Sequence, residues 1–227
     1  SDMIVQNASH PIPTPGNIYG YITAPTEAPG SLETMGVPMT FKRNSEIYGE
    51  KEPSDYLYKV TTGAVRTYRI LADGRRQIGA FYLPGDVFGL ESRKTHVFSA
   101  ETITDSKLVA IKRSTIVTLA ARDSAVAREL WNVTTCELER VQQHLVALIK
   151  SAEERVAGFL LEMAKRTPGT NQVQLPMSRQ DIADYLGLTI ETVSRTMTHL
   201  ESTAAIALPS SRCVVLRNKV TLGRLNS

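Results

Sequence analysis

Residues 178–195, SRQDIADYLGLTIETVSR, place one glycine between two segments of helical character. The first segment opens with Ser178 and Asp181, an S-x-x-D spacing in which the hydroxyl caps an early backbone N–H and the carboxylate favours the positive helix end. The apolar face of this short helix consists of Ile182, Ala183 and Leu186. Gly187 tolerates the sharp turn that follows, because glycine adopts conformations closed to other residues.

The second segment offers a matching apolar stripe. Thr189 can cap this helix, Leu188 is a buried-type residue in the turn, and the small side chain of Ala183 lets the two helices approach closely. The inward stripe is formed by Ile190, Val193, Met197 and Leu200. The sequence therefore predicts a helix-turn-helix whose second helix is positioned to enter a DNA major groove.

Three polar side chains, those of Glu191, Ser194 and Arg195, occupy the face of the second helix that is left after packing. Arginine can donate two parallel hydrogen bonds to guanine O6 and N7, glutamate can accept from cytosine N4, and serine can serve adjacent bases or phosphate. The alternative is an ordinary solvated Glu191–Arg195 pair, worth about 0.3 kcal/mol on a helix. Because these residues lie in a helix-turn-helix with N-caps and matching apolar faces, base recognition is the favoured interpretation.

The chain of 227 residues is long enough for two ordinary domains, and its 42% apolar and 22% charged residues are typical of a globular protein. No apolar run approaches the roughly 18 residues that suggest a membrane span. The N-terminus lacks the order of a secretory signal, and Cys136 and Cys213 are too far apart for a disulfide framework or zinc spacing. We expect a cytoplasmic protein with no membrane partner. The net charge is only +3, but no acidic residue follows Glu201, so the C-terminal end is locally basic.

Two different patterns precede the helix-turn-helix. Residues 1–40 contain six prolines and no Lys or Arg, which predicts an extended or partly disordered N-terminal arm. Residues 41–112 alternate apolar and polar side chains between turn signals, which predicts a small antiparallel barrel or sandwich. One turn signal, Asp73-Gly74, suits a type I′ hairpin, in which both central residues need positive φ.

The period changes to that of a helix from about residue 113 to 166, with no Gly or Pro between Val126 and Arg155. Apolar or small residues alternate there at spacings of four and three, as in a coiled-coil seam. The seam runs through Thr134, Leu138, Val141, Leu145, Leu148 and Ala152. A long helix at a two-fold dimer axis is favoured, and the alternative is a helix that lies against its own barrel.

These segments together resemble the CRP/FNR family of bacterial transcription regulators. The resemblance rests on PGDVFG after the hairpin-rich segment, on the long helix and on MSRQDIADYLGLTIETVSRTMTHLE, whose ETVSR string is similar to the FNR and FixK branch. It covers roughly residues 41–227 and implies an α+β fold. The implied parts are an N-terminal arm (1–40), an antiparallel β-roll like a cyclic-nucleotide-binding domain (41–125), a dimerisation helix (126–154) and a winged helix-turn-helix (155–227).

The resemblance also implies partners and site residues. Glu191, Ser194 and Arg195 match the recognition positions of the family, which implies a homodimer on a palindrome of the TTGAT-N4-ATCAA type and an activator that contacts RNA polymerase. The segment after Ile206, through SSRCVVLRNKVTL, is expected to form the wing. We expect contacts to the DNA backbone from Ser178, Arg179, Thr189, Thr192, Arg212 and Lys219.

The sequence predicts no cofactor and no small-molecule effector. Where family members that bind cyclic AMP have a Glu and an Arg-Ser pair, this chain has Leu90 and Phe98-Ser99, so that no arginine is available for the phosphate. Two cysteines cannot supply the four thiolates of an iron–sulfur cluster. A single histidine could serve as a haem ligand, but the four histidines show no grouping and each is expected to be a surface or partly buried residue.

Four alternatives remain open at this point. Cys213 lies beside Arg212, so oxidation near DNA is an alternative to its role as a small apolar filler; for Cys136, packing is favoured over a cross-link. A cupin-like metalloenzyme is disfavoured because residues 41–112 contain only His96 as a histidine ligand. An effector- or redox-gated repressor of the same fold is the main rival to the activator.

Overall fold

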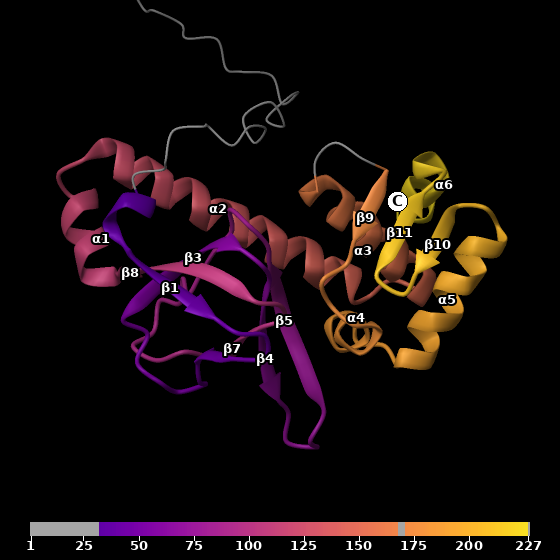
Figure 1. Ribbon diagram of the computed structural model, residues 1–227, viewed down its shortest axis with the longest axis horizontal. Helices are drawn as coiled ribbons and strands as arrows, with labels where there is room; N and C mark the ends of the chain where they lie inside the picture. Colours follow the sequence, from indigo (N-terminus) through magenta and orange to yellow (C-terminus); the bar gives the residue numbers. More distant parts are fainter. Residues whose placement is uncertain (1–31, 168–170, 227) are drawn as a thin grey trace, which may run out of the picture.

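The computed structural model describes residues 32–167 and 171–226. Most of the predicted N-terminal arm, with His10, lies outside the described residues. The two β-sheets lie at one end and a helical domain at the other, and a long helix runs over the sheets along the longest axis toward the helical domain (Figure 1). This arrangement confirms the predicted α+β fold with an antiparallel roll, a long helix and a winged helix-turn-helix.

The roll is built from two four-stranded antiparallel sheets. The first has the strand order β1 (Val37–Phe41), β8 (Ser106–Lys112), β3 (Tyr56–Thr62) and β6 (Val87–Phe88). The second has the order β2 (Glu46–Tyr48), β7 (Ser99–Thr102), β4 (Val65–Ile70) and β5 (Arg76–Tyr82). Aromatic side chains that fill the space between them include Tyr48, Tyr58, Tyr82 and Phe88. Strand β1, preceded by the short 3-10 helix η2 (Glu33–Met35), begins inside the segment that was expected to be arm.

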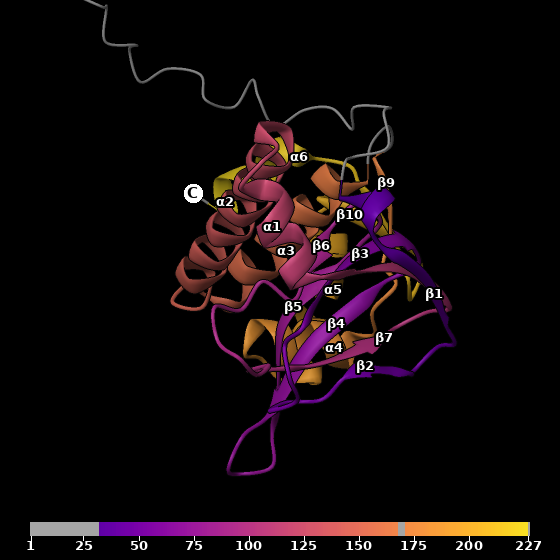
Figure 2. The same cartoon turned by 90° about the vertical axis from the view of Figure 1, so that its left-hand side faces the viewer.

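The β4–β5 hairpin projects from the roll (Figure 2), and its turn corrects one prediction. Gly74 has a positive φ of 84°, whereas Asp73 does not, so the type I′ prediction is wrong. The Gly74 N–H donates to Leu71 O at 2.9 Å, and the Leu71 N–H donates to Arg75 O at 2.8 Å. The connection is therefore longer than two residues, and only its glycine has to adopt the left-handed conformation.

Three helices follow the roll, namely α1 (Arg113–Ala120), α2 (Ser124–Ala147) and α3 (Ala152–Arg166). The dimerisation helix was expected to continue to residue 154, but α2 ends at Ala147. The reason lies at Ser151, whose hydroxyl accepts from the Glu154 N–H while the Glu154 carboxylate accepts from the Ser151 N–H at 2.7 Å. This capping box starts a new helix where the apolar spacing alone indicated a continuous one.

The C-terminal domain packs three helices against a small sheet. The helices are α4 (Arg179–Leu186), α5 (Ile190–Ser202) and α6 (Lys219–Leu225). The sheet has the order β10 (Ile206–Ser210), β11 (Cys213–Leu216) and β9 (Gln172–Gln174). The β10–β11 hairpin is the wing. Lys219 was expected in the wing but is the first residue of α6, where Asn218 caps the helix through the Thr221 N–H.

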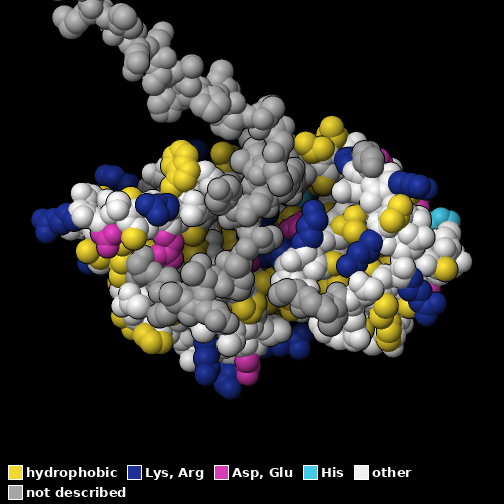
Figure 3. Space-filling view, turned by 90° about the horizontal axis from the view of Figure 1, so that it is seen from above, with side chains coloured by type: hydrophobic (Ala, Val, Ile, Leu, Met, Phe, Trp, Pro, Cys, Tyr) yellow, Lys and Arg dark blue, Asp and Glu magenta, His cyan; other side chains and the backbone are white. Residues whose placement is uncertain are grey.

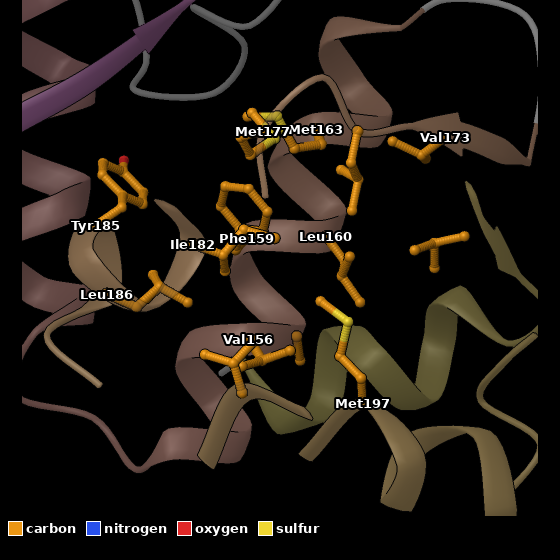
Figure 4. Packing of buried hydrophobic residues seen from close by; sticks show 14 of the residues in the cluster. Val156, Phe159, Leu160, Met163, Val173, Met177, Ile182, Tyr185, Leu186 and Met197 are labelled. Carbon is orange, nitrogen blue, oxygen red and sulfur yellow. The ribbon is translucent and has the colours of Figure 1, made fainter. Parts of the chain in front are cut away.

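One apolar cluster joins the roll to the C-terminal domain. Figure 4 shows Phe159 and Leu160 of α3 at its centre, with Met163 of the same helix, Ile182 of α4 and Met197 of α5 around them. The roll contributes Ala64, Ile78, Phe81 and Ile103 to the same cluster. Because the two domains share this core, the direction of the helix-turn-helix depends on contacts with the roll. None of the described helices combines the length and apolar character needed to cross a bilayer.

Candidate nucleic-acid interface

The first helix of the motif, α4, begins as the sequence predicts. The Ser178 hydroxyl accepts from the Asp181 N–H at 3.0 Å, and the Asp181 carboxylate accepts from the Ser178 N–H at 3.1 Å. The apolar face of α4 is buried, as expected, through Ile182, Ala183 and Leu186. The helix ends at Gly187, whose φ of 64° lies in the left-handed region, and the Leu188 N–H then donates to Ala183 O at 3.0 Å. The turn is therefore fixed by backbone geometry.

The second helix, α5, separates its side chains onto two faces. Thr189 caps the helix by accepting from the Thr192 N–H at 3.2 Å. Val193, Met197 and Leu200 are buried, as the stripe predicts. Ile190 was expected in that stripe but is 37% exposed, because it lies in the first turn, before the helix meets its neighbours.

The predicted recognition side chains Glu191, Ser194 and Arg195 all lie on the exposed face of α5. Within residues 32–167 and 171–226, Glu191 and Arg195 do not form an ion pair with each other or with another residue. The ordinary i, i+4 pair, which was the alternative interpretation, is therefore not what holds these side chains. Their hydrogen-bonding groups are available to an external partner.

Two arginines near the start of α4 lie close enough to repel each other. Burial, followed by the positive charge of Arg212, lowers the pKa of Arg179 below its usual value. The Nη1 atom of Arg179 is buried and has no hydrogen-bond partner among the described residues. Arg212 is held in place by donating to the carbonyl of Pro176. Two cations, one of them incompletely satisfied, make a local site that an anion would relieve.

Lys and Arg side chains are prominent around the surface of the C-terminal domain in the view from above (Figure 3). Lys219 is exposed at the start of α6. The other residues expected to contact the DNA backbone, Ser178, Thr189 and Thr192, are engaged in the caps of α4 and α5. Caps place backbone N–H groups at helix starts, where they can bind phosphate.

The expected dimer seam is only partly continuous. Leu138, Val141 and Leu145 on α2 are 56%, 56% and 66% exposed. Leu148 is half-buried just beyond the end of α2, and Ala152 opens α3. The coiled-coil reading missed further exposed apolar side chains on or next to α2, which are Trp131, Val146 and Ile149. The opposite face of α2 lies against the roll, where Tyr82 donates to the Glu137 carboxylate at 2.7 Å.

A cavity of about 440 Å³ lies between the roll and α2. Its walls are largely apolar and include Leu90 and Phe98, the two positions where the sequence departs from cyclic-nucleotide binding. Arg140 is the one Lys or Arg among the described residues that line it, and Asp86 and Glu137 already pair with this guanidinium at 3.1 and 3.0 Å. These residues do not fit a cyclic-nucleotide phosphate.

The remaining candidates are packed into the fold. Cys213 is 5% exposed and its sulfur lies 3.1 Å from Gln172 Nε2, which favours the packing role over a redox role. Cys136 is half-buried on α2. His96 is buried, stacked on Tyr48 and 3.1 Å from the Glu91 carboxylate. The described residues contain no group of three or more His, Cys, Asp or Glu placed to hold a metal ion.

Comparison with known proteins agrees with this geometry. A family model for the Crp-like helix-turn-helix domain matches residues 154–225, and one for the cyclic nucleotide-binding domain matches residues 38–123. The fold and the site therefore define a DNA-binding transcription regulator, not an enzyme. The chain belongs to the CRP/FNR family.

Within that family the chain is similar to FixK proteins. It is 49% identical to the nitrogen fixation regulation protein FixK of Azorhizobium caulinodans, over 86% of this chain and 82% of the relative. It is 39% identical to the transcriptional activatory protein AadR of Rhodopseudomonas palustris, over 78% of this chain and 76% of that one. The structure of FixK2 from Bradyrhizobium japonicum matches with a TM-score of 0.80 and 49% identity, over 85% of this chain and 98% of the other.

Proposed function

We propose that this protein is a homodimeric transcription activator that binds a TTGAT-N4-ATCAA type palindrome, contacts RNA polymerase and needs no small-molecule effector. The observation that carries the proposal is the exposed face of α5. Glu191, Ser194 and Arg195 lie on one face of a helix whose opposite face is buried, and Glu191 and Arg195 have no ion-pair partner among the described residues.

The recognition step follows from the donors and acceptors on that face. The Arg195 guanidinium suits a guanine, where it can donate to O6 and N7 together. The Glu191 carboxylate, one helical turn earlier, suits the amino group of a neighbouring cytosine. Ser194 can donate to a base or a phosphate beside them. Base contacts of this kind set the preferred sequence, while contacts to the DNA backbone fix the register.

Affinity comes mainly from phosphate contacts in this proposal. Arg179 and Arg212 form the local cationic site at the start of α4, and a DNA phosphate is the anion that would relieve it. The helix starts at Ser178 and Thr189, with Thr192, would add backbone N–H and hydroxyl donors. Lys219 is exposed on α6 and is proposed as a more distant phosphate contact.

The homodimer is proposed to form along the exposed apolar face of α2. Leu138, Val141 and Leu145 form the part of the seam that lies on this helix, and Trp131 and Ile149 extend it. A contiguous apolar patch on a protein surface indicates a partner surface. A second copy would bring a second α5 to the next major groove, about 34 Å away, as a palindromic site requires.

Independence of an effector is supported by the side chains around the cavity between the roll and α2. Arg140, the one Lys or Arg among the described residues that line it, is already paired with Asp86 and Glu137, so no free cation is available there for an effector phosphate. The rival is an effector- or redox-gated repressor, and the apolar cavity of about 440 Å³ is the observation that favours it. Polymerase contact is inferred from the family and from the activator relative.

The proposal is tested by fluorescence anisotropy of the purified protein, with no added ligand, on the palindrome and on a copy with both half-site guanines replaced. We expect nanomolar binding to the first duplex and at least roughly tenfold weaker binding to the second, about 1.4 kcal/mol. Weak and equal binding to both duplexes would contradict effector independence and favour the gated rival.

A further inference from the structure

The Asp181 carboxylate takes part in both the capping box of α4 and ion pairs with arginines of the β-roll. As the third residue of the α4 capping box, its carboxylate accepts from the Ser178 N–H at 3.1 Å. The same carboxylate accepts from Arg66 Nη1 of β4 at 3.0 Å and from Arg76 Nη2 of β5 at 2.6 Å. Its side chain is only 4% exposed. The start of the helix-turn-helix is therefore bound directly to the β-roll.

Two further acidic residues complete this group, which we call the α4 clamp: Arg66, Arg76, Glu101, Asp181 and Asp184. Arg76 Nε donates to Asp184 at 2.7 Å, one turn further along α4. Arg66 Nη2 donates to Glu101 of β7 at 2.9 Å. Charge-assisted bonds of this kind, shielded from water, are directional and hold one geometry more strictly than apolar contact does.

The α4 clamp holds α4 against two strands of the roll. Asp181 and Asp184 lie on the same side of the helix and contact adjacent antiparallel strands, which limits sliding and rotation. Aromatic packing adds a third point of contact between α4 and the rest of the protein. The ring of Tyr185 stacks on that of His144 of α2, with 4.0 Å between the ring centroids, and its centroid lies 5.1 Å from that of Phe81 of β5. Since the turn at Gly187 is also fixed, the position of α5 follows from that of α4.

This docked arrangement leaves the recognition face open. In Figure 1, α4 lies beside the β4–β5 hairpin, whereas α5 lies at the end of the molecule away from the roll. Glu191, Ser194 and Arg195 are exposed in the same arrangement. The contacts that hold α4 therefore do not compete with DNA for α5.

We propose that Arg66 and Arg76 are positioning residues for DNA binding. Through the α4 clamp, the roll holds the recognition helix in its DNA-competent direction, with protein side chains supplying the coupling between roll and helix-turn-helix. This inference rests on the proposed function of α5 in DNA recognition. Arg76 is the better site for a test, because it is 25% exposed and its replacement leaves Asp181 paired with Arg66.

The test compares three variants of the full-length protein by fluorescence anisotropy on the palindromic duplex. Arg76→Met is expected to weaken specific binding at least about tenfold, and Arg76→Lys, which keeps the charge but not the fork, is expected to recover part of the loss. Arg75→Met is the matched control. Arg75 is adjacent and exposed, pairs with Asp73 and belongs to the same hairpin, so its replacement should leave binding unchanged.

A second measurement separates positioning from loss of folding. Nitroxide labels at Thr198→Cys, an exposed position on α5, in a Cys136→Ser background report the distance between the recognition helices of a dimer by double electron–electron resonance. We expect a narrow distribution for the parent and the Arg75→Met control and a broad one for Arg76→Met, with unchanged far-ultraviolet circular dichroism at the assay temperature.

If Arg76→Met binds within twofold of the parent with an equally narrow distribution, or binds more tightly, the positioning role is wrong. If Arg76→Met loses its circular dichroism while Arg76→Lys folds, binds and gives the same distribution as the parent, the clamp is structural only and the proposal is overturned. If the parent does not distinguish the palindrome from its guanine-replaced copy, the proposed function itself fails.

Discussion

The two helices of the helix-turn-helix use their polar residues in different ways. Both begin with a hydroxyl cap and both bury an apolar stripe. The acidic side chains of α4, Asp181 and Asp184, are paired with arginines of the roll. On α5, Glu191 and Arg195 have no ion-pair partner among the described residues. Similar local sequence therefore gives one helix that assembles the protein and one whose polar face is left for an external molecule.

The largest expected effect is a loss of stability on replacing a paired acidic residue of α4, compared with replacing an exposed one of α5. Asp181→Ala removes the buried carboxylate that Arg66 and Arg76 share, while Glu101 and Asp184 remain as their second partners, and should lower the free energy of unfolding by about 3 kcal/mol. Glu191→Ala removes a charge of the same sign from the exposed face of α5 and should change it by less than about 0.5 kcal/mol. Urea unfolding of both variants measures the difference, and equal losses would contradict the division between the helices.

The next largest effect is expected from the loss of dimerisation, which should weaken DNA binding because two copies of α5 must bind the palindrome together. Leu145→Glu places a charge on the exposed apolar face of α2 and should yield monomers by sedimentation velocity. The loss of linked binding should weaken affinity for the palindrome at least about a hundredfold, or roughly 2.8 kcal/mol. Gln142→Glu, also exposed on α2 but outside the seam, is the control. A Leu145→Glu variant that remains dimeric would place the interface elsewhere.

Removal of the hydroxyl caps is expected to give smaller losses of stability, which are similar for the two helices. Ser178→Ala and Thr189→Ala each remove a hydroxyl that accepts from a backbone N–H, so each should cost about 1 kcal/mol of stability. Ser178→Ala should cost more, because it also disturbs the carboxylate that Arg66 and Arg76 share. Thermal unfolding of the two variants checks the order. A larger loss for Thr189→Ala would mean that the α4 clamp does not depend on the cap.

The smallest expected effect concerns phosphate binding at the start of α4. Arg179→Met should reduce the slope of log affinity against log salt by about one unit while leaving sequence preference unchanged. Its stability should be maintained or increased, because burial and the repulsion from Arg212 already disfavour the charged form. Titrations at several salt concentrations on both duplexes make the measurement. A changed preference between the duplexes would instead indicate that Arg179 reads bases.

The sequence predicted the local structure of this motif better than its long-range contacts. Ser178, Asp181 and Gly187 are local signals, and the cap, the turn and the exposed recognition face follow from them. The arginine partners of Asp181 are 115 and 105 residues away in the chain, so no spacing within the motif could indicate them.

Two predictions were wrong because they relied on apolar spacing close to the end of a helix. The apolar spacing from Leu138 to Ala152 indicated one helix, but the S-x-x-E sequence at Ser151 and Glu154 starts a second helix inside it. Ile190 has the correct spacing for the α5 stripe, yet its position in the first turn leaves it exposed. In both cases helix ends, and not hydrophobic period, decided the outcome.

The most direct test of the central claim is a double-mutant cycle between Arg195 and the half-site guanine. Anisotropy gives the affinities of the parent and of Arg195→Ala for the palindrome and for its guanine-replaced copy. We predict that Arg195→Ala costs about 1–3 kcal/mol on the palindrome and little on the replaced copy, so that the preference for guanine nearly disappears. An unchanged ratio between the two duplexes would show that Arg195 does not read the base.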